Sequence, residues 1–274
     1  MNTLTFTKMQ SLGNDFILVD ALEKPWTLMR EAIATIAHRQ YGIGFDQLLL
    51  LEPPEQPECD AHFRIFNADG SEAEQCGNGA RAVALWMRDR KGAREVVRFS
   101  MIQGRRLECY LLRDNQVAVS FSPPIFLPSE APMLGAVNLG NPHAVFLVDH
   151  WPLLGMDKEK IKWANQQPQF PNGVNVGFMQ ILNSSHIRLQ VIERGSGLTL
   201  ACGSGACAAV VVGRAQQALE AEVVVSQPGG DCVVQFPALT GNITLIGSAE
   251  TVYEGHLYPA YFQSLATRQH RNMV

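Results

Sequence analysis

The segment Cys76-Gly77-Asn78-Gly79-Ala80-Arg81-Ala82 decides the fold, because the chain contains a second copy of it, Cys202-Gly203-Ser204-Gly205-Ala206-Cys207-Ala208. Each copy leads into an apolar run, and an arginine follows twelve positions after each cysteine. A second matching pair precedes them, Leu12-Gly13-Asn14 and Leu139-Gly140-Asn141. Its asparagines lie 62 residues before Cys76 and 61 before Cys202. The chain is therefore an internal duplication of a unit of about 125 residues.

Length and composition agree with two ordinary domains. The chain has 274 residues, and the duplication favours two domains over one large one. Hydrophobic residues make up 46% and charged residues 18%, with a net charge of −4. This composition is neither basic enough for a nucleic-acid surface nor polar enough for disorder. We expect a protein that acts on a small molecule and has no nucleic-acid partner.

Targeting signals and cysteine usage predict a cytoplasmic protein. The segment Met1–Lys8 lacks the basic and then apolar pattern of a signal peptide. No apolar run approaches the roughly 20 residues of a membrane span, so no membrane partner is expected. The six cysteines show no paired spacing of the kind found in disulfide scaffolds. A reducing compartment would keep them as thiols.

Apolar spacing predicts the elements of each half. It indicates a helix near residues 28–38 in the first half and one near 158–166 in the second, among several short strands. After each repeated cysteine, a segment rich in alanine and valine predicts a long helix, ending near Gly92 and near Leu219. These helices are apolar nearly all round, so they are expected to be buried. The predicted fold class is α+β, with two pseudo-symmetric domains, each a barrel-like mixed sheet wrapped around a central helix.

Prolines mark the predicted domain boundary. Ser122-Pro123-Pro124 separates an N-terminal domain, 1–124, from a C-terminal domain, 125–251. A strand is predicted from Glu250 to Tyr258, and Thr267–Val274 has the composition of a polar tail.

The residues of the repeated segment are suited to acid–base chemistry and to anion binding. A cysteine at the first position of a helix lies where unpaired N–H groups and the helix dipole favour negative charge, which predicts a lowered thiol pKa. The following glycines leave the first-turn N–H groups accessible to a carboxylate or phosphate. If the two halves face each other, Cys76 and Cys202 approach one carbon from opposite sides. That geometry is typical of racemisation or epimerisation without a cofactor.

Other interpretations apply to parts of this pattern. A zinc site from Cys202, Cys207, His143 and His186 does not have a usual ligand spacing, so no metal is expected. The glycines also match a dinucleotide-binding fingerprint, but the strand after the second copy lacks the acidic residue that holds a ribose. The remaining cysteines are expected to be core residues: Cys59, Cys109, Cys207 and Cys232.

Polar residues that are candidates for substrate binding lie near the repeated cysteines. Asn67 and Glu193 each lie nine residues before a repeated cysteine, so the duplication puts a neutral and a charged residue in equivalent places. Arg194 follows Glu193 and is suited to bidentate recognition of a carboxylate. Taken singly, Asn14, Asn67, Asn141 and Asn175 would more often be turn formers than ligands, and His143 alone would more often be a surface histidine.

The chain resembles the diaminopimelate epimerase family nearly from end to end. The stretches that carry the resemblance are Leu12–Phe16, Gly44–Gln47, Phe66–Ser71, Cys76–Arg81, Gly140–His143, Asn175–Phe178, Glu193–Gly195 and Ala201–Cys207. The resemblance implies an isomerase that interconverts LL- and meso-2,6-diaminopimelate in lysine and peptidoglycan synthesis. It implies no cofactor, a homodimer with a contact at Tyr253, and a C-terminal strand, 252–262, that returns to the first domain.

The resemblance also implies the site residues. Cys76 and Cys202 would be the acid–base thiols, the first as proton donor and the second as acceptor. His143 and Glu193 would tune their pKa values. Substrate contacts would come from Asn14, Gln47, Asn67, Gly77, Asn78, Asn141, Asn175, Glu193, Arg194, Gly203 and Ser204.

The chain departs from the family pattern in places that carry no implied role. Leu198 and Leu200 stand where glutamate and a polar residue are usual, and Gln10-Ser11 replaces a common His-Gly. A proline racemase-like or phenazine-pathway isomerase would share the scaffold with a different polar pocket. An amino-acid-binding module would keep the pocket and lack one thiol.

Overall fold

The computed structural model describes residues 4–26, 29–93, 95–150, 157–195, 197–239, 241–258, 260–261 and 264. They form two compact units. Unit 1 comprises the described residues up to Val117 together with those from Ala249 onward, and unit 2 runs from Ala118 to Ser248. The sequence-based domains, 1–124 and 125–251, stay a prediction. The expected tail, Thr267–Val274, and part of the expected strand at 252–262 lie outside the described residues.

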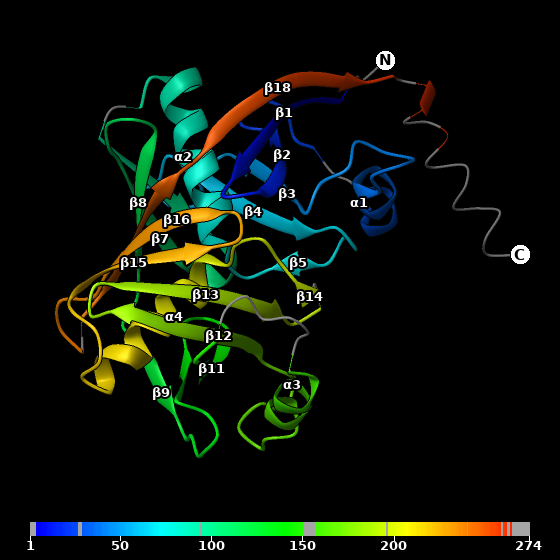
Figure 1. Cartoon of the computed structure of the whole chain (residues 1–274). Coiled ribbons are helices and arrows are strands. Elements are labelled where there is room, and N and C mark those ends of the chain that lie inside the picture. Colours follow the sequence, from blue (N-terminus) through cyan, green and yellow to red (C-terminus); the bar gives the residue numbers. More distant parts are fainter. Residues whose placement is uncertain are drawn as a thin grey trace, which may run out of the picture. The chain divides into compact units, whose positions relative to one another are not determined.

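Figure 1 labels most of the elements of both units. Unit 1 contains β1 (Leu4–Ser11), β2 (Asn14–Asp20), α1 (Arg30–Ala37), β3 (Gln47–Glu52), β4 (Ala61–Asn67), β5 (Glu72–Ala73), α2 (Gly77–Lys91), β6 (Val96–Ser100), the 3₁₀ turn η1 (Ile102–Gly104), β7 (Arg106–Leu111) and β18 (Glu250–Leu257). Strand β8 (Gln116–Phe121) spans the boundary at Val117. Unit 2 contains β9 (Ile125–Leu127), β10 (Gly135–Asn138), β11 (Pro142–Leu147), α3 (Lys158–Asn165), β12 (Asn175–Asn183), β13 (His186–Glu193), β14 (Gly197–Leu198), α4 (Gly203–Ala215), β15 (Glu222–Gln227), β16 (Gly230–Gln235) and β17 (Ile243–Ser248).

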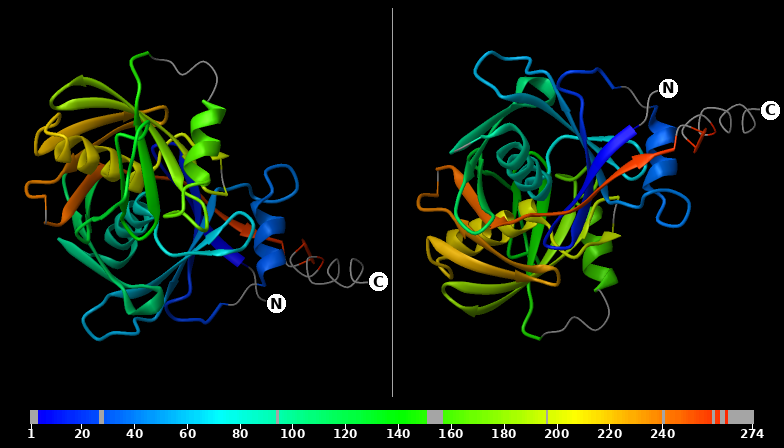
Figure 2. Two further views of the ribbon diagram at one scale, coloured as in Figure 1. Left: turned by 90° about the horizontal axis from the view of Figure 1, so that it is seen from below. Right: turned by 90° about the horizontal axis from the view of Figure 1, so that it is seen from above.

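The two units repeat one strand connectivity. Unit 1 pairs its strands in the order β18–β1–β2–β3–β4–β6–β7, with β2–β3 and β4–β6 parallel and the other pairs antiparallel. Unit 2 follows β9–β10–β11–β12–β13–β15–β16–β17, with β11–β12 and β13–β15 parallel. The short strands β5 and β14 pair with β4 and β13. The repeat in the sequence is thus also a repeat in topology. Figure 2 shows β18 running alongside β1.

Each sheet curls around its central helix, as expected. Helix α2 contacts β18 and β1 at one end of the strand order and β7 at the other. Helix α4 contacts β10 to β13 and also β16 and β17. Every residue of α2 from Gly77 to Met87 is buried, as are most residues of α4. The α+β fold predicted from the sequence is confirmed.

Strand β3 shows why this sheet has near-continuous apolar strands. Leu48 and Leu50 pack in a cluster with Ile33 of α1 on one face. Leu49 points to the other face, since a Cβ atom on Gly79 of α2 would lie 3.0 Å from its Cδ2 atom. Helices cover both faces, so both sets of side chains are buried and the strand reads as an unbroken leucine run.

Helix α4 ends at Ala215, four residues before the predicted end at Leu219. Gln217 adopts a left-handed conformation, with φ of 58°, which turns the chain back. Leu219 then packs on Gly213, where an added Cβ would lie 2.3 Å from its Cδ1 atom. The other repeated helix ends as predicted, with Gly92 as a left-handed cap at φ of 74°. No helix in the described part of the chain is long and apolar enough to cross a membrane.

Candidate active site

The repeated cysteines are the N-cap residues of α2 and α4. Cys76 and Cys202 have extended backbones, with φ/ψ of −147°/106° and −125°/110°. The Cys76 Sγ atom accepts a hydrogen bond from Gly79 N at 3.2 Å, and Cys202 Sγ accepts one from Gly205 N at 3.4 Å. Each sulfur takes the place of the serine or aspartate oxygen of an ordinary cap, one residue before the helical position expected from the sequence.

The second glycine of each repeat makes room for the capping sulfur. A Cβ atom on Gly205 would lie 3.2 Å from Cys202 Sγ and 2.8 Å from Val191 Cγ2. A Cβ atom on Gly79 would lie 3.4 Å from Cys76 Sγ. The glycines therefore permit close approach of sulfur to the first helical turn, in addition to exposing N–H groups.

In unit 1, the Asn14 amide contacts Cys76, and the amides of Gln47 and Asn67 bond to each other. Its thiol donates to Asn14 Oδ1 over 3.9 Å. Gln47 and Asn67 are paired in the β3–β4 register, and Gln47 Nε2 donates to Asn67 Oδ1 at 3.0 Å. Asn67 Nδ2 in turn donates to Ser71 Oγ at 3.1 Å. The Gln47 Oε1 atom is buried and has no hydrogen-bond partner among the residues that the structure describes.

Asn78, in the first turn of α2, is buried next to a buried cation. Its Oδ1 atom accepts a hydrogen bond from Arg81 Nη2 at 2.6 Å, and the same Nη2 donates to Ser11 Oγ at 2.9 Å. Arg81 is fully buried. Cys207 takes the equivalent position in the second repeat, so the two repeats differ in charge at this point.

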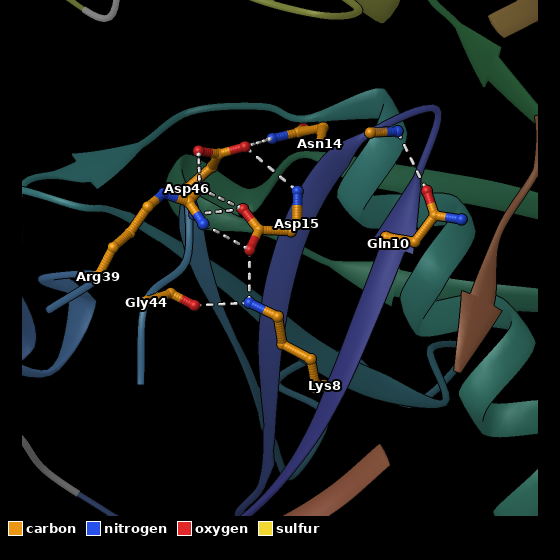
Figure 3. Close-up of polar contacts among 8 residues, drawn as sticks. Lys8, Gln10, Asn14, Asp15, Arg39, Gly44 and Asp46 are labelled. Atoms are coloured by element: carbon orange, nitrogen blue, oxygen red, sulfur yellow. Dashed lines mark hydrogen bonds and ion pairs between the residues drawn. The ribbon is translucent and has the colours of Figure 1, made fainter. Parts of the chain in front are cut away.

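A network of charged side chains, which the sequence analysis missed, holds Asn14 (Figure 3). Asp46 Oδ2 accepts from Asn14 Nδ2 at 2.9 Å, and Arg39 donates to both Asp46 and Asp15. Burial alone would raise the pKa of Asp15, but the hydrogen bonds and charges of Arg39 and Lys8 lower it to about 2. The signal was present in the sequence, because Asp15 and Asp46 are direct neighbours of Asn14 and Gln47.

In unit 2, His143 and Ser204 connect Asn141 to Cys202. The His143 Nε2 atom lies 3.0 Å from both Asn141 Oδ1 and Ser204 Oγ. Ser204 Oγ lies 3.6 Å from Cys202 Sγ, and Asn141 Nδ2 donates to Ser204 Oγ at 3.4 Å. Burial lowers the pKa of His143 to about 3, so its imidazole is neutral at ordinary pH.

The expected lowering of the thiol pKa is wrong for Cys202. Only 4% of this residue is exposed, and burial raises the pKa of its thiol well above the ordinary value. The Glu193 carboxylate raises it further. Hydrogen bonds from Ser204 and the Gly205 N–H act in the opposite direction and do not outweigh burial. Desolvation therefore affects the pKa of the Cys202 thiol more strongly than the capping hydrogen bonds and the helix terminus do.

The remaining unit 2 candidates are ordered by local contacts. Thr199 Oγ1 donates to Glu193 Oε1 at 2.6 Å. Thr199 lies between Leu198 and Leu200, which depart from the family pattern, and both leucine side chains are exposed. Asn175 Oδ1 accepts from the Arg194 backbone N–H at 2.8 Å, which fixes the chain where β13 ends. The Arg194 side chain is exposed, with Nη1 donating to Asn172 O at 3.2 Å.

Gln227 is a further residue that the sequence analysis missed. It lies at the end of β15, and its buried Oε1 atom accepts from Cys202 N at 2.8 Å. Its Nε2 atom lies 3.7 Å from Cys232 Sγ. Nothing in the sequence pattern distinguishes Gln227 from an ordinary strand-end residue.

Two other candidates lie apart from these clusters. Tyr253 is on β18, half exposed, with its ring edge-on to Phe6 at 6.1 Å between centroids. His186, considered for zinc, lies 2.9 Å from Ser226 Oγ. Among the described residues, no group of three or more histidine, cysteine, aspartate or glutamate side chains is placed to hold a metal ion.

Comparison with known proteins identifies the family. A family model described as diaminopimelate epimerase matches residues 6–126 and 135–252. A diaminopimelate epimerase from Coxiella burnetii (strain Dugway 5J108-111) is 43% identical over 272 residues, covering 92% of this chain and 98% of that protein. The chain belongs to the diaminopimelate epimerase family. Membership of the diaminopimelate epimerase family makes it an isomerase that acts as an amino-acid epimerase.

Solved structures share the fold at low sequence identity. A phenazine biosynthesis protein of the PhzF family from Bacillus anthracis matches with a TM-score of 0.72 at 16% identity, covering 94% of this chain and all of that one. A hydroxyproline epimerase from Agrobacterium vitis, with bound trans-4-hydroxy-L-proline, matches with a TM-score of 0.69 at 15% identity, covering 95% and 94%. The chain thus shares its fold with proteins of other names, and the fold alone does not decide the substrate.

Proposed function

We propose that the chain interconverts LL- and meso-2,6-diaminopimelate by a two-base mechanism, with Cys76 and Cys202 as the acid–base groups and no cofactor. The observation that carries this proposal is the matched pair of thiols at helix N-caps, each with its sulfur on the third N–H group of its helix. A duplicated thiol in a duplicated setting suits a reaction that treats the two faces of one carbon alike.

The proton steps balance without a co-reactant. The Cys202 thiolate removes the α-proton and becomes a thiol, while the Cys76 thiol gives its proton to the opposite face and becomes a thiolate. The product has the inverted configuration, and exchange with water returns both sulfurs to their starting forms. The reverse reaction uses the same groups with exchanged roles.

The environment of Cys202 suits the role of base. A thiol with a raised pKa gives a thiolate that is more basic, which favours removal of a weakly acidic C–H proton. The Glu193 carboxylate contributes to that pKa, and we assign it the tuning role. His143 stays neutral and orders Ser204 and Asn141, so it acts through hydrogen bonds and not through charge.

The helix N-termini supply the electrophilic stabilisation that the carbanion needs. The first N–H groups of a helix have no partner within the helix. In this proposal the first turns of α2, at Gly77 and Asn78, and of α4, at Gly203 and Ser204, face the reacting carboxylate, so that the positive ends of both helix dipoles stabilise the negative charge that develops there. A pyridoxal cofactor is then unnecessary as an electron sink.

Amide and guanidinium side chains hold the rest of the substrate. The buried Gln47 Oε1 atom is an acceptor suited to a substrate ammonium group. Arg194 exposes a guanidinium that can bind a carboxylate in bidentate fashion, and we assign it to the non-reacting end. The other assigned contacts are Asn14, Asn67, Asn141, Asn175 and Glu193.

We also propose the setting of the reaction. The chain would act in the cytoplasm, in lysine and peptidoglycan-precursor synthesis, as a homodimer. For the dimer we assign a contact at Tyr253, because β18 exposes both Tyr253 and its neighbour Val252. Equilibrium sedimentation of the wild type and a Tyr253→Ala variant tests this assignment, and a monomeric wild type would refute it.

Substitution of the two thiols tests the mechanism. Cys76→Ser and Cys202→Ser should each lower kcat by about 10²–10⁴-fold on LL-diaminopimelate without added pyridoxal phosphate. Cys59→Ser is the matched control, since Cys59 is buried like Cys202 but lies outside the repeated segments, and the kcat of this variant should match the wild type. Activity above a tenth of wild type in either repeat variant, or a preference for proline as substrate, would overturn the proposal.

Solvent labelling tests whether two bases act. In deuterated water at low conversion, the product should carry deuterium at the inverted carbon while recovered substrate carries almost none. A single base would return label to both pools. Equal labelling of substrate and product would therefore show that one group serves both faces.

A further inference from the structure

We infer that Asp46 is a positioning residue that fixes the orientation of the Asn14 amide, so that its oxygen and not its nitrogen faces the Cys76 thiol. The inference deepens the proposed function and rests on the roles proposed there for Asn14 and Cys76. Asp46 itself does not touch the thiol in the described contacts.

The chemistry of the two ends of the Asn14 side chain carries the inference. A carboxylate only accepts hydrogen bonds, so the group that meets Asp46 Oδ2 at 2.9 Å must be the amide nitrogen of Asn14. The Asn14 oxygen is then directed to Cys76, whose thiol donates to it over 3.9 Å. An aspartate at position 46 thus decides which way the amide points.

Asp46 is in turn held in place on both of its oxygens (Figure 3). Its Oδ2 atom also accepts from Asp15 N at 3.2 Å, and its Oδ1 atom accepts from Arg39 Nη2 at 2.8 Å. The Asp46 backbone N–H donates to Asp15 O at 2.9 Å. These contacts leave the carboxylate little freedom to rotate away from Asn14.

The same network orders the strand that carries Asn14. Arg39 bridges Asp46 and Asp15, and Lys8 on β1 pairs with Asp15 and with Gly44 O. Lys8, Asp15, Arg39 and Asp46 are the charged groups of this network, and Arg81 of α2 is a further cation nearby, since it donates to Ser11, the register partner of Asn14. The equivalent Asn141 has no such carboxylate in its described contacts and is held instead by His143 and Ser204. Asn14 and Asn141 are equivalent in the duplication, but different side chains hold their amides in place.

Asp46→Asn is the most direct test, because an asparagine at this position accepts either orientation of Asn14. We expect kcat/KM to fall roughly ten- to hundred-fold, mainly through kcat. Asp46→Glu, which keeps an acceptor-only group, should recover part of the loss. The matched control is Glu108→Gln, since Glu108 forms an ion pair with Arg98 at 2.9 Å and has 42% side-chain exposure, against 44% for Asp46. It should leave kcat/KM unchanged.

A double-mutant cycle separates positioning from loss of charge. If Asp46 acts through the amide, Asp46→Asn should have almost no further effect in an Asn14→Ala background. The pH dependence of Cys76 alkylation by iodoacetamide, followed by peptide mass spectrometry, gives a readout without turnover. In Asp46→Asn, alkylation of Cys76 should begin at a lower pH than in the wild type. In the double variant Asn14→Ala, Asp46→Asn, it should follow the same pH dependence as in Asn14→Ala alone.

The outcomes distinguish this inference from the proposed function. Full additivity in the cycle, or an alkylation shift of the same size without Asn14, would overturn the positioning role and leave the thiol mechanism intact. Full activity of Cys76→Ser would refute the proposed function, while the alkylation arm would still report on the link between Asp46 and Cys76.

Discussion

The buried Oε1 atom of Gln227 accepts a hydrogen bond from the backbone N–H of Cys202 at 2.8 Å. This contact anchors the residue that precedes α4 to the end of β15. Gln227→Leu removes this acceptor, so the buried backbone N–H group of Cys202 loses its hydrogen bond to Gln227.

For Gln227→Leu we expect the free energy of unfolding to fall by about 1–3 kcal/mol, the cost of a buried unsatisfied donor. The kcat value should fall as well, because the cysteine backbone loses its anchor. Urea titration and steady-state kinetics measure both. Gln235→Leu is the control, since that glutamine bonds to Glu222 at an exposed position. Equal stability of the two variants would contradict the anchoring role.

Gly205→Ala should impair catalysis more than it impairs folding. Alanine favours helix over glycine by up to about 1 kcal/mol, but the new Cβ would lie 3.2 Å from Cys202 Sγ and 2.8 Å from Val191 Cγ2. Displacement of the sulfur predicts a fall in kcat of roughly ten-fold or more.

Gly92→Ala provides the contrast to Gly205→Ala. Gly92 has φ of 74° and open space around it, so alanine there strains the backbone without touching a thiol. It should cost about 1 kcal/mol of stability and leave kcat unchanged. A normal kcat in Gly205→Ala would show that the close approach of sulfur is not needed.

His143 should make stability fall with acid. Its folded pKa is about 3 and the unfolded imidazole titrates near about 6.5, so the unfolded state binds the extra proton between these values. Stability is fully present above that window and is lost as pH falls through it, by at most about 1.4 kcal/mol per pH unit.

Unfolding of the wild type and His143→Asn should be compared from neutral pH to pH 4. Other groups titrate in both proteins, so the difference in slope isolates His143. The variant should show the shallower loss of stability. Parallel pH dependences would mean that the imidazole is not buried in its neutral form.

Arg194→Lys should raise KM for diaminopimelate roughly ten-fold with a smaller change in kcat, because a point charge cannot replace the planar fork. Arg188→Lys on the exposed face of β13 should change neither constant. An unaltered KM in the Arg194 variant would remove this residue from the site.

Much of the fold could be predicted from local patterns. The leucine run of β3 and the apolar stretches Ala82–Met87 of α2 and Ala206–Val212 of α4 are strongly apolar, and burial follows directly from that. The short strands β5, β9, β10 and β14 were not predicted, since two to four residues give no periodicity. The early end of α4 depends on Leu219 packing back on Gly213, a contact that no local propensity encodes.

The candidate site was likewise only partly predictable from the sequence. The duplication located both thiols and the first-turn glycines, because equivalent positions can be read from aligned repeats. The place of each cysteine at a helix start predicted a lowered thiol pKa, and that was wrong for Cys202, because the cost of desolvation depends on tertiary burial. Asp46 is a sequence neighbour of Gln47, but its contact with Asn14 spans 32 residues, and Gln227 lies 25 residues from Cys202 with no pattern to mark it.

The return of β18 to β1 means that unit 1 is encoded by two separate stretches of chain. During synthesis on the ribosome, every residue of unit 2 is made before β18. Unit 2 therefore has all its strands at a time when β1 still lacks one neighbour. Until β18 arrives, β1 presents an unpaired edge, the kind of surface that nascent-chain chaperones shield from aggregation.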